Sequence, residues 1–396
     1  MFAIQILDNL SPEALKLLDP SKYKSGAEID NPDVILVRSR KLHDHSFLNQ
    51  LKAVGRAGVG TDNIPVATLT ELGIPVFYAP GANANAVKEL VLAAMLIGYR
   101  HLDEARMFLD RLTENDKEAL SREIESQKKK FVGHEIAGKT LGVIGLGNIG
   151  VKIANSALAL GMHVLAYDPH MTLTNALALM PDVEKAVDMN VLLSHSDIIT
   201  LHVPLTADTT HLISEQNIQY IKPQSLLLNF SREQVVSEKA IIEQLNNDGL
   251  LGYITDFPTP HLASNPKVLS FPHLGASTTE AESNSAEMVI RNMCNFLESG
   301  VIEHSINFPD TFLPLTQLAD CHRIIIINQN KPGVIAHVTQ KISESGYNIE
   351  RMVNTSRENI AVNLIDISGI SELPSRLVKS FESIDSVIRI RIVGVQ

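Results

Sequence analysis

A glycine-rich motif in the middle of the chain has the clearest chemical meaning, because Gly145, Gly147 and Gly150 follow a short apolar run and open a segment with helical periodicity. Glycines at these places permit a tight turn, the approach of the backbone to a pyrophosphate, and close packing of a helix against a strand. The N-terminus of that helix offers unpaired N–H groups to an anion. Asp168 ends the next strand-like run, where a carboxylate binds ribose hydroxyls and repels a 2′-phosphate. The pattern predicts a dinucleotide site that favours NAD over NADP.

The segments around this motif predict a doubly wound parallel sheet. Short apolar runs that suit buried strands alternate with stretches that have helical periodicity, and this alternation is typical of parallel α/β layers. The strands expected in this part of the chain span residues 141–144, 163–167, 198–202, 225–229 and 250–256.

The beginning of the chain has the same alternation and predicts a second set of parallel α/β layers. Ser11 suits the N-cap of a helix, and Pro12 suits its first helical position. Longer helical stretches are expected before and after the dinucleotide-binding core. Strands are expected at 2–7 and 34–37, and helices at 11–18, 43–51, 84–111 and 279–298.

The last part of the chain, residues 321–396, has a different character. Its strand-like and helix-like runs follow the order βαββαβ, which predicts a small ferredoxin-like module. A proline-containing segment precedes it, and we expect residues 306–320 to be a linker.

The composition limits the class of protein. The chain has 396 residues, of which 44% are hydrophobic and 20% charged, and its formal net charge is −11. This length predicts two or three domains, and the acidic total argues against a general nucleic-acid binder. Two separate cysteines, Cys294 and Cys321, provide no disulfide framework and no paired metal motif, so we expect a reducing compartment and no metal site. We recognise no signal peptide and no membrane-spanning run, and we expect a cytoplasmic protein.

Further motifs complete a resemblance to a known family. LHVPLT (201–206), LLLNFSREQVV (226–236) and FPHLGAST (271–278) follow the glycine motif in this order. VRSR (37–40), GRAGVGTDNI (55–64) and PGANANAVKEL (80–90) precede it. Together these motifs resemble the signatures of the D-isomer-specific 2-hydroxyacid dehydrogenases, and the resemblance covers residues 30–305.

This resemblance implies a fold and a domain order. We expect an α/β protein in which a Rossmann-type doubly wound parallel sheet is inserted in a flavodoxin-like α/β substrate domain, followed by the ferredoxin-like module. Long helices like those expected here commonly form dimer interfaces in the family, so we expect a homodimer or homotetramer. The expected domains are a substrate domain at 1–96 and 277–305, an NAD-binding domain at 97–276, the linker at 306–320 and the C-terminal domain at 321–396.

The resemblance also assigns catalytic roles. Arg232 matches the family's arginine, whose guanidinium can hold a substrate carboxylate through two N–H donors. His273 matches the catalytic histidine, which accepts the hydroxyl proton while hydride leaves C2 for the nicotinamide. The family usually has a glutamate beside this histidine, but no carboxylate occurs between Asp256 and His273. We expect His273 to act without that partner, and Glu233 is the alternative source of a carboxylate.

The cofactor contacts implied by the resemblance lie on the same motifs. Asp256 matches an aspartate that contacts the nicotinamide carboxamide, and Thr206 matches a hydroxyl on the cofactor side. A strand-end carboxylate and a turn hydroxyl are the alternative roles at these two positions. The residues expected to contact NAD are Gly145, Gly147, Asn148, Ile149, Gly150, Asp168, His202, Val203, Pro204, Thr206, Phe230, Ser231, Asp256, His273 and Gly275.

A small anionic substrate follows from the segments that precede the glycine motif. Arg38 matches an arginine that faces the substrate phosphate in phosphoglycerate-type members, and the resemblance adds backbone N–H groups near Gly58 for a carboxylate. Arg40 and Lys139 are further cations that we expect near the cleft. The expected substrate is therefore 3-phosphoglycerate. Its expected contacts are Arg38, Ser39, Arg56, Gly58, Val59, Gly60, Asn83 and Arg232.

The C-terminal module resembles an ACT domain, a small-molecule sensor fused to enzymes of amino-acid metabolism. The resemblance rests on Asn330-Lys-Pro-Gly333 and on Gly346-Tyr-Asn348, and Gly333 opens a helix whose N–H groups could meet a carboxylate. It implies an L-serine effector held across a domain dimer at Asn328, Asn330, Gly333 and Asn348, although position 328 is a histidine in one branch. The alternatives are turn and strand-end roles for these residues, and a module that only dimerises.

A core of this family followed by an ACT module resembles the members that oxidise 3-phosphoglycerate to 3-phosphohydroxypyruvate in serine synthesis. One alternative is a sibling enzyme that acts on glyoxylate, hydroxypyruvate or phosphoerythronate. Another is a non-catalytic regulator that senses NAD. The presence of both Arg232 and His273 favours an enzyme.

Overall fold

The computed structural model describes residues 1–315, 321–368 and 375–394. The chain forms two compact units. Met1–Asn83 and Thr279–Gln396 make up the first unit, and Ala84–Thr278 make up the second. The second unit is therefore an insertion in the first. The domain boundaries expected at 96/97 and 276/277 stay a prediction.

The first unit contains a parallel five-stranded sheet. Its strands are β1 (Phe2–Ile6), β2 (Tyr23–Gly26), β3 (Val34–Val37), β4 (Ala53–Arg56) and β5 (Val76–Phe77), and its helices are α1 (Pro12–Leu15), α2 (Val66–Glu71) and α11 (Thr279–Ser299). The strands lie in the order β2-β1-β3-β4-β5, which is the flavodoxin-like order that we expected. The strand order reverses between β1 and β3, so the carboxyl ends of these two strands border the place where ligands bind in such sheets.

Local sequence explains part of this unit and fails in one segment. Ser11 caps α1 by accepting the N–H of Ala14, and Pro12 is the first helical residue, as predicted. The prediction of a helix at 43–51 was wrong, because this segment consists of two short turns and irregular backbone. Its histidine, aspartate, serine and asparagine residues have low helix propensity, and its turns bury Leu51 without a continuous helix.

The second unit is built on a parallel seven-stranded sheet. Its strands are β6 (Thr140–Ile144), β7 (His163–Tyr167), β8 (Glu184–Lys185), β9 (Ile198–Leu201), β10 (Ser225–Asn229), β11 (Leu250–Thr255) and β12 (Val268–Ser270). They lie in the order β12-β11-β10-β9-β6-β7-β8. This is the Rossmann order extended by β12 at one edge, and it confirms the expected doubly wound sheet.

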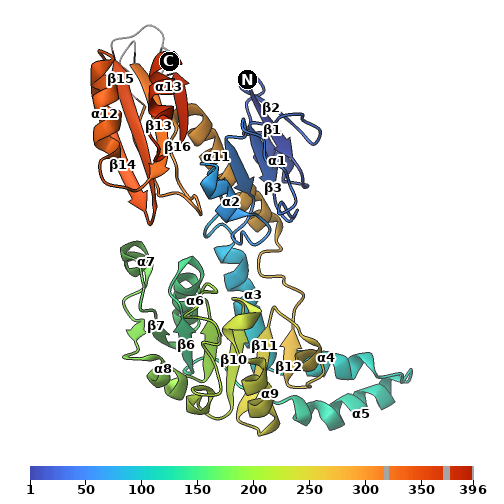
Figure 1. The fold of residues 1–396 in the computed structure, drawn as a ribbon. Coiled ribbons are helices and arrows are strands. Elements are labelled where there is room, and N and C mark those ends of the chain that lie inside the picture. The colour runs from blue at the N-terminus through green and yellow to red at the C-terminus, as the bar shows by residue number, and fades with distance from the viewer. Residues whose placement is uncertain (316–320, 369–374, 395–396) are drawn as a thin grey trace. The chain divides into compact units, whose positions relative to one another are not determined.

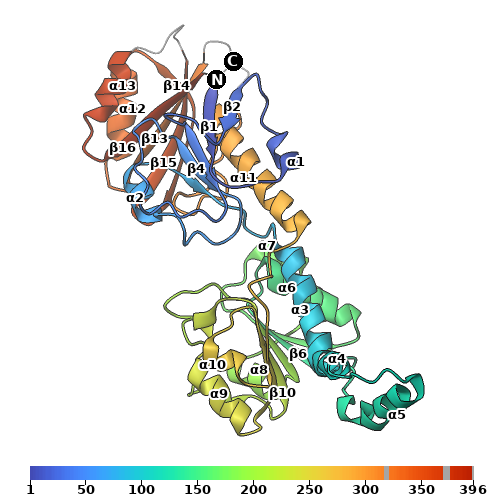
Figure 2. The same ribbon diagram turned by 90° about the vertical axis from the view of Figure 1, so that its right-hand side faces the viewer.

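The helices of the second unit cover both faces of this sheet or extend beyond it. They are α3 (Ala84–Tyr99), α4 (Leu102–Asp110), α5 (Lys117–Gln127), α6 (Asn148–Ala159), α7 (Leu173–Ala178), α8 (Met189–His195), α9 (Glu238–Asn246) and α10 (Pro260–Ala263), with 3-10 turns η1 (Lys128–Phe131), η2 (Ile218–Tyr220) and η3 (Glu233–Val235). The cores show that α3 and α6 pack on one face, and α8 and α9 on the other. The single helix expected at 84–111 is divided by His101, which has a left-handed φ of 49°. The helices α4 and α5 extend beyond the sheet and contain no buried residue (Figures 1 and 2).

The C-terminal part of the first unit is a four-stranded antiparallel sheet. Its elements are β13 (Cys321–Gln329), α12 (Val334–Glu344), β14 (Asn348–Arg357), β15 (Ile360–Ser368), α13 (Ser375–Glu382) and β16 (Val387–Gly394). The order β14-β15-β13-β16 is that of a ferredoxin-like βαββαβ fold, and both helices pack on one face (Figure 1). Residues 369–374 and 395–396 of this expected module lie outside the described residues.

The antiparallel sheet packs on the end of α11. The guanidinium of Arg391 lies 4.7 Å from the ring centroid of Phe296 and donates to the carbonyl oxygen of Phe296 at 3.0 Å. Burial lowers the pKa of Arg391 to about 10. Arg323 is fully buried, forms two hydrogen bonds to Asp366 at 2.7 and 2.9 Å, and donates to the carbonyl oxygen of Ser299 at 2.9 Å. These contacts hold the C-terminal end of α11 against the sheet.

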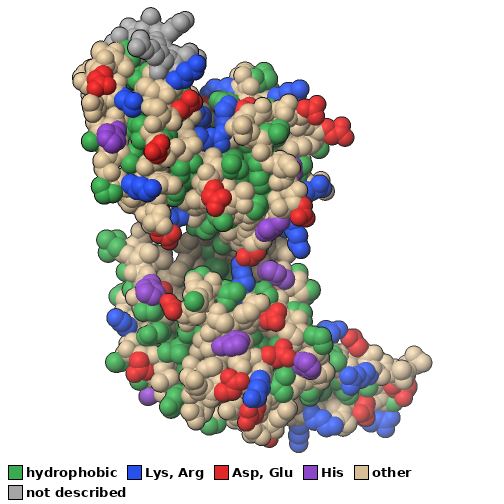
Figure 3. Space-filling view, viewed as in Figure 1, with side chains coloured by type: hydrophobic (Ala, Val, Ile, Leu, Met, Phe, Trp, Pro, Cys, Tyr) green, Lys and Arg blue, Asp and Glu red, His purple; other side chains and the backbone are tan. Residues whose placement is uncertain are grey.

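The expected linker has a packed beginning. Phe308 is fully buried in the core of the first unit, and Thr311 pairs with Ile302 through backbone hydrogen bonds. Residues 316–320 of the expected linker lie outside the described residues. Within the described ranges, we find no helix with the length and apolar character needed to cross a membrane. On the face drawn in Figure 3, positive and negative side chains are interspersed.

Candidate functional site

The glycine motif forms the turn between β6 and α6. Gly145 has a left-handed φ of 92°, and a Cβ atom there would lie 2.5 Å from the carbonyl oxygen of His202. A Cβ atom at Gly150 would lie 1.9 Å from the carbonyl oxygen of Gly145. A Cβ atom at Gly147 would meet no protein atom within 4 Å. The first and third glycines are therefore required by the fold, while the second leaves open space beside the backbone.

The residues around this turn fit a dinucleotide. Gly147 is the N-cap of the 12-residue helix α6 and provides no side-chain acceptor for its first N–H groups, which include those of Asn148 and Ile149. Asp168 directly follows β7, and its carboxylate accepts the N–H of Leu146 at 2.7 Å. The structure thus places open space, helix N–H groups and a fixed carboxylate together, which suits a pyrophosphate and a ribose.

His202 lies at the end of β9, beside the glycine turn. Its Nε2 atom is 2.8 Å from Oγ1 of Thr200, while its Nδ1 atom is buried without a hydrogen-bond partner among the described residues. Burial lowers the pKa of His202 to about 3, so the ring stays neutral at physiological pH. A buried polar atom without a partner is unusual in a folded protein and is consistent with a ligand-binding region.

Other residues expected at the cofactor have structural contacts. Ser231 donates from Oγ to the carbonyl oxygen of Leu201 at 2.7 Å and accepts the N–H of Val203, which joins the ends of β9 and β10. Phe230 belongs to the core of the second unit. The hydroxyl of Thr206 lies 3.0 Å from that of Thr209 in the turn after Pro204. This contact fits the turn role left open for Thr206, and its contact with a cofactor stays a prediction.

Arg232 follows β10 in a turn that Asn229 organises. Asn229 is fully buried; its side-chain oxygen accepts the N–H of Ser231 at 3.0 Å, and its amide donates to the carbonyl oxygen of Arg232 at 2.9 Å. The guanidinium of Arg232 donates to the carbonyl oxygen of Ser231 at 2.7 Å. It forms no ion pair with a described carboxylate, so its charge is available to an anionic ligand.

The loop of His273 is held by Asp256, which is 2% exposed at the end of β11. The carboxylate oxygens of Asp256 accept the N–H groups of Leu274 and Gly275, each at 2.7 Å. The carbonyl oxygen of Asp256 accepts the N–H of His273 at 3.1 Å. His273 has a left-handed φ of 56°, which these contacts stabilise. In this structure the carboxylate of Asp256 positions the loop that carries the histidine.

The imidazole of His273 has no carboxylate partner among the described residues. The side chain is exposed, and its recorded ring contact is with Phe257, at a centroid distance of 5.0 Å. Glu233, the alternative carboxylate, is exposed in the turn after Arg232 and forms no recorded bond with the histidine. The described structure thus offers no replacement for the family's glutamate.

In the first unit, residues 38–40, which include two of the expected substrate residues, lie at the edge where the strand order reverses. One oxygen of Asp8, just after β1, accepts the N–H groups of Arg38, Ser39 and Arg40 at 2.6, 2.9 and 3.0 Å. Partial burial acts to raise the pKa of Asp8, but these N–H bonds outweigh it and the pKa lies below its usual value. Asn63 donates to the carbonyl oxygen of Arg40 at 2.8 Å. The loop after β3 is therefore rigid, and its N–H groups are already used.

The side chain of Arg38 forms an ion pair with Glu282 of α11, at 2.6 Å between Nη2 and Oε1. Both side chains are partly exposed, at 35% and 41%. A pocket of about 710 Å³ lies beside this loop and is lined by residues that include Asp8, Asn9 and Arg40. At the switch point of the five-stranded sheet, Arg40 thus lines a cavity, and Arg38 lies two residues earlier in the same loop.

The other residues expected near the substrate have different environments from one another. The N–H of Gly58 donates to the carbonyl oxygen of Arg56 at 2.8 Å, and the guanidinium of Arg56 packs on Gly58, so the N–H groups of Val59 and Gly60 remain for an anion. The amide oxygen of Asn83 is buried without a partner among the described residues. Lys139 precedes β6 at its amino end, away from the edge that carries the glycine turn.

The expected effector residues lie at two ends of the antiparallel sheet. Asn328 is 2% exposed and accepts the amide of Asn363 at 2.7 Å, and Asn330 donates to the carbonyl oxygen of Glu358. Asn348 pairs with Ser368, and Ser368 pairs with Cys321 at the other end of β13. For a strand of this length, that end lies roughly 25 Å from Asn328. Gly333 caps α12 with a φ of 85° and offers no side-chain acceptor. One copy of the sheet therefore does not bring all four residues together.

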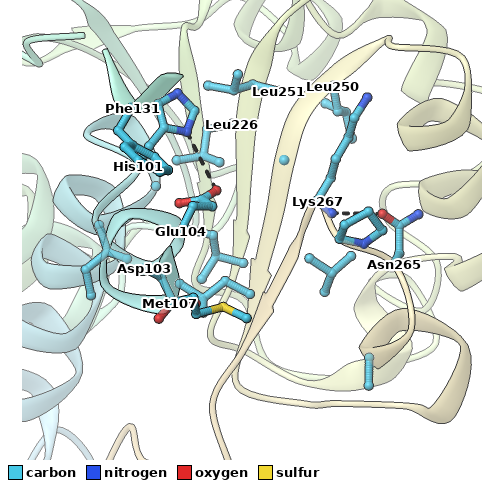
Figure 4. A pocket seen from close by; sticks show the side chains of 18 of the residues that line it. His101, Asp103, Glu104, Met107, Phe131, Leu226, Leu250, Leu251, Asn265 and Lys267 are labelled. Carbon is cyan, nitrogen blue, oxygen red and sulfur yellow. Dashed lines mark hydrogen bonds and ion pairs between the residues drawn. The ribbon is translucent and has the colours of Figure 1, made fainter. Parts of the chain in front are cut away.

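A further pocket lies away from these residues. It has a volume of about 900 Å³ and lies in the second unit among α3, α4, β11 and β12, where His101, Glu104, Met107 and Lys267 line it (Figure 4). None of the expected cofactor, substrate or catalytic residues lines it. The described residues contain no group of three or more His, Cys, Asp or Glu side chains arranged to hold a metal ion.

Three positioning residues were missed by the sequence reasoning. Asn229 is a polar residue at the end of the buried strand β10, and Asp8 lies two residues after β1, so a polar side chain near a strand end is a local signal for both. Glu282 is one of two acidic residues in the first turn of α11, and its pairing with Arg38 has no local signal.

Comparison with known proteins defines the class. The sequence model "D-isomer specific 2-hydroxyacid dehydrogenase, NAD binding domain" matches residues 93–275. The D-3-phosphoglycerate dehydrogenase of Methanocaldococcus jannaschii is 34% identical over 357 residues, which are 85% of this chain and 65% of that relative. The D-3-phosphoglycerate dehydrogenase of Dictyostelium discoideum is 31% identical over 380 residues, 92% of this chain and 88% of that relative.

A solved structure supports the fold. The NAD⁺-bound 3-phosphoglycerate dehydrogenase of Entamoeba histolytica matches with a TM-score of 0.60 at 22% identity, over 79% of this chain and 99% of that chain. The Rossmann-type unit with its glycine turn coincides with the residues that match the NAD-binding domain of this dehydrogenase family. The chain belongs to the D-isomer-specific 2-hydroxyacid dehydrogenases, which confirms the resemblance seen in its motifs.

Proposed function

We propose that the chain oxidises D-3-phosphoglycerate to 3-phosphohydroxypyruvate with NAD, the first step of L-serine synthesis. The observation that carries this proposal is Arg38, which a rigid loop holds at the switch point of the five-stranded sheet. A phosphorylated hydroxy acid needs such a cation in addition to the one that binds its carboxylate. The names of the relatives described above support the same substrate.

In the proposed reaction, Arg232 binds the substrate carboxylate and His273 accepts the proton of the C2 hydroxyl. Arg232 suits its role because it follows a buried turn and forms no ion pair with a described carboxylate. His273 suits its role because Asp256 fixes its backbone while its ring stays exposed. A positioned base and a bidentate cation are what this oxidation requires of the protein.

The cofactor, when bound, supplies the acceptor for the hydride that leaves C2. The N–H groups at the start of α6 would hold its pyrophosphate, and Asp168 would bind a ribose hydroxyl. Gly145 and Gly150 maintain the turn, and Gly147 provides the open space. Both carboxylate oxygens of Asp256 already accept backbone N–H groups, from Leu274 and Gly275. We therefore assign Asp256 mainly to the positioning of His273.

Steady-state kinetics with the full chain and NAD test the reaction. We expect turnover of D-3-phosphoglycerate with NAD to exceed that of phosphoerythronate with NAD. We also expect it to exceed the turnover of glyoxylate and hydroxypyruvate, which are reduced and are therefore assayed with NADH. A preference for one of those compounds would identify a sibling enzyme instead. The variant His273→Ala should lose about 10²- to 10⁴-fold in kcat while NAD binding persists, whereas a sensor of NAD would show no turnover to lose.

We propose further that the antiparallel sheet is an ACT domain at residues 321–396 that binds L-serine. Its ferredoxin-like strand order supports this assignment, as does the N-terminus of α12, where the N-cap Gly333 provides no side-chain acceptor. Because Asn330 and Asn348 lie at opposite ends of one sheet, a complete effector site needs a second copy of the module. Calorimetry with L-serine, repeated on Asn348→Ala, tests the site, and absence of heat in both proteins would leave only a dimerising module.

The remaining assignments follow from this function. We propose a cytoplasmic homodimer or homotetramer, with a substrate domain at 1–96 and 277–305, an NAD-binding domain at 97–276 and a linker at 306–320. The insertion of residues 84–278 in the first unit supports a discontinuous substrate domain. Light scattering of the purified chain would give the oligomeric state, and limited proteolysis would locate the boundaries.

A further inference from the structure

The ion pair between Arg38 and Glu282 puts a negative charge beside the proposed phosphate cation. Nη2 of Arg38 donates to Oε1 of Glu282 at 2.6 Å, and this is the one contact recorded between the two side chains. The two residues are 244 positions apart, so the pair forms only in the folded first unit. Both side chains are partly exposed, and such pairs are weak enough for a stronger anion to displace.

The backbone around both residues leaves the pair little freedom to move away. Asp8 fixes the backbone of Arg38 through three N–H bonds within its loop. Glu282 lies in the first turn of α11. Its neighbour Ala281 is buried, and Oγ of Ser283 lies 3.0 Å from Oγ of Ser11, the N-cap of α1. The carboxylate of Glu282 therefore stays near Arg38 at high effective concentration.

We infer that Glu282 is an internal competitor that weakens binding of the substrate phosphate at Arg38. This inference rests on the proposed function, because it takes Arg38 as the phosphate-binding cation. A phosphate group with nearly two negative charges displaces the carboxylate from the guanidinium but stays close to it. Glu282 thus acts on substrate affinity and leaves the transfer of proton and hydride unchanged.

Two effects of Glu282 oppose phosphate binding, and one favours it. The ion pair must be broken before the phosphate binds. The displaced carboxylate then repels the phosphate, and physiological salt screens this repulsion only in part because its Debye length is about 8 Å. In favour of binding, the pair restrains the Arg38 side chain before substrate arrives. The first two effects involve full charges and outweigh the last, because the loop backbone is already fixed by Asp8.

The test compares wild type with Glu282→Gln, which keeps the shape of the side chain and removes its charge. With D-3-phosphoglycerate and saturating NAD, we expect the KM of the variant to fall by about fivefold at low salt, with kcat unchanged. Because the effect is electrostatic, the difference in KM should shrink at an ionic strength near 1 M, where the Debye length is about 3 Å. With D-glycerate, which lacks the phosphate, the two proteins should have equal KM values.

Glu280→Gln is the matched control, because it removes an exposed carboxylate from the same first turn of α11. It reproduces any loss of interaction with the helix dipole and should leave the KM close to wild type. A KM that rises in Glu282→Gln would make Glu282 an orienting residue and overturn the inference. An unchanged KM in an active enzyme, or an equal fall with D-glycerate, would overturn it as well. Absence of turnover in wild type would instead overturn the proposed function.

Discussion

Asp256 and Gly275 are joined by a hydrogen bond of 2.7 Å from the N–H of Gly275 to Oδ2 of Asp256. Because the other oxygen of this buried carboxylate accepts the N–H of Leu274, one side chain fixes two successive peptide groups after His273. Charge-assisted bonds of this kind are about twice as strong as neutral ones. The orientation of the exposed imidazole therefore depends on a buried group at the end of β11.

Replacing Asp256 by asparagine should disturb this loop more than the cofactor site. An asparagine retains one acceptor and turns an N–H₂ group toward a donor, so we expect a loss of about 1–3 kcal/mol in the free energy of unfolding. We expect kcat to fall at least tenfold, while NAD affinity, measured by fluorescence titration, changes less. Asp248→Asn, which alters an exposed carboxylate of the same unit, is the control. A variant with normal kcat would show that the clamp is not needed.

The glycine turn predicts opposite outcomes for two alanine substitutions. Gly147→Ala places its methyl group in open space, so the free energy of unfolding should change by less than about 0.5 kcal/mol. The same methyl group would obstruct a pyrophosphate, so NAD affinity should fall at least tenfold, roughly 1.4 kcal/mol. Gly150→Ala would push a methyl group against the carbonyl oxygen of Gly145 and should destabilise the fold itself. Urea unfolding and NAD titration separate the two effects, and equal destabilisation of both variants would contradict the assignment.

His202 should make the fold sensitive to acid. An unfolded histidine takes up a proton near pH ~6.5, whereas the folded ring does so only near pH 3 because it is buried. Between these values the unfolded chain binds more protons, so the stabilisation is complete above pH ~6.5 and is lost as the pH falls toward 3. At pH 5 the loss should be on the order of 1–2 kcal/mol in urea unfolding.

His202→Gln provides the comparison for this pH dependence. Glutamine can bond Thr200 but does not titrate, so the difference in unfolding free energy between pH 7 and pH 5 should shrink. His163→Gln, at an exposed position of β7, should keep the wild-type difference. If both variants kept it, another group would be responsible for the acid sensitivity.

The buried pair of Arg323 and Asp366 should dominate the stability of the antiparallel sheet. Arg323→Met would leave a fully buried carboxylate with Arg351 as its remaining partner, and breaking a buried pair in this way costs about 3–5 kcal/mol. Arg351→Met should cost less, because Arg351 is 33% exposed and Asp366 keeps both bonds to Arg323. Urea unfolding of the two variants gives the ranking, and the reverse order would refute this view of the pair.

The sequence predicted the buried strands of both units better than some of the helices. The strands at 163–167 and 225–229 have the predicted bounds, because short apolar runs bounded by polar residues are a local signal for buried strands. The helix expected at 84–111 contains Gly98 three residues before its break, a local signal that we did not use, but nothing local indicates the left-handed conformation of His101. The segment at 43–51 has apolar residues at helical spacing but too many residues with poor helix propensity.

The candidate site also has one part that local sequence predicts and another part that it does not. The glycine turn was predictable because all of its parts lie within one short segment. The contact between Asp8 and Arg38 spans 30 positions, and the pair of Arg38 and Glu282 spans 244. Spacing within a segment carries no information on such partners. The roles of Asp256 and Ser231 also depend on which groups their side chains reach after folding.

The three N–H bonds to Asp8 have a thermodynamic consequence for ligand binding. The backbone of residues 38–40 loses its conformational entropy when the chain folds, so an incoming ligand does not bear that loss. A loop that is already ordered increases affinity mainly because the ligand does not have to offset this loss of conformational entropy. Binding at Arg38 should therefore need little more than rearrangement of a single side chain, and its rate should approach that of an encounter with a rigid surface.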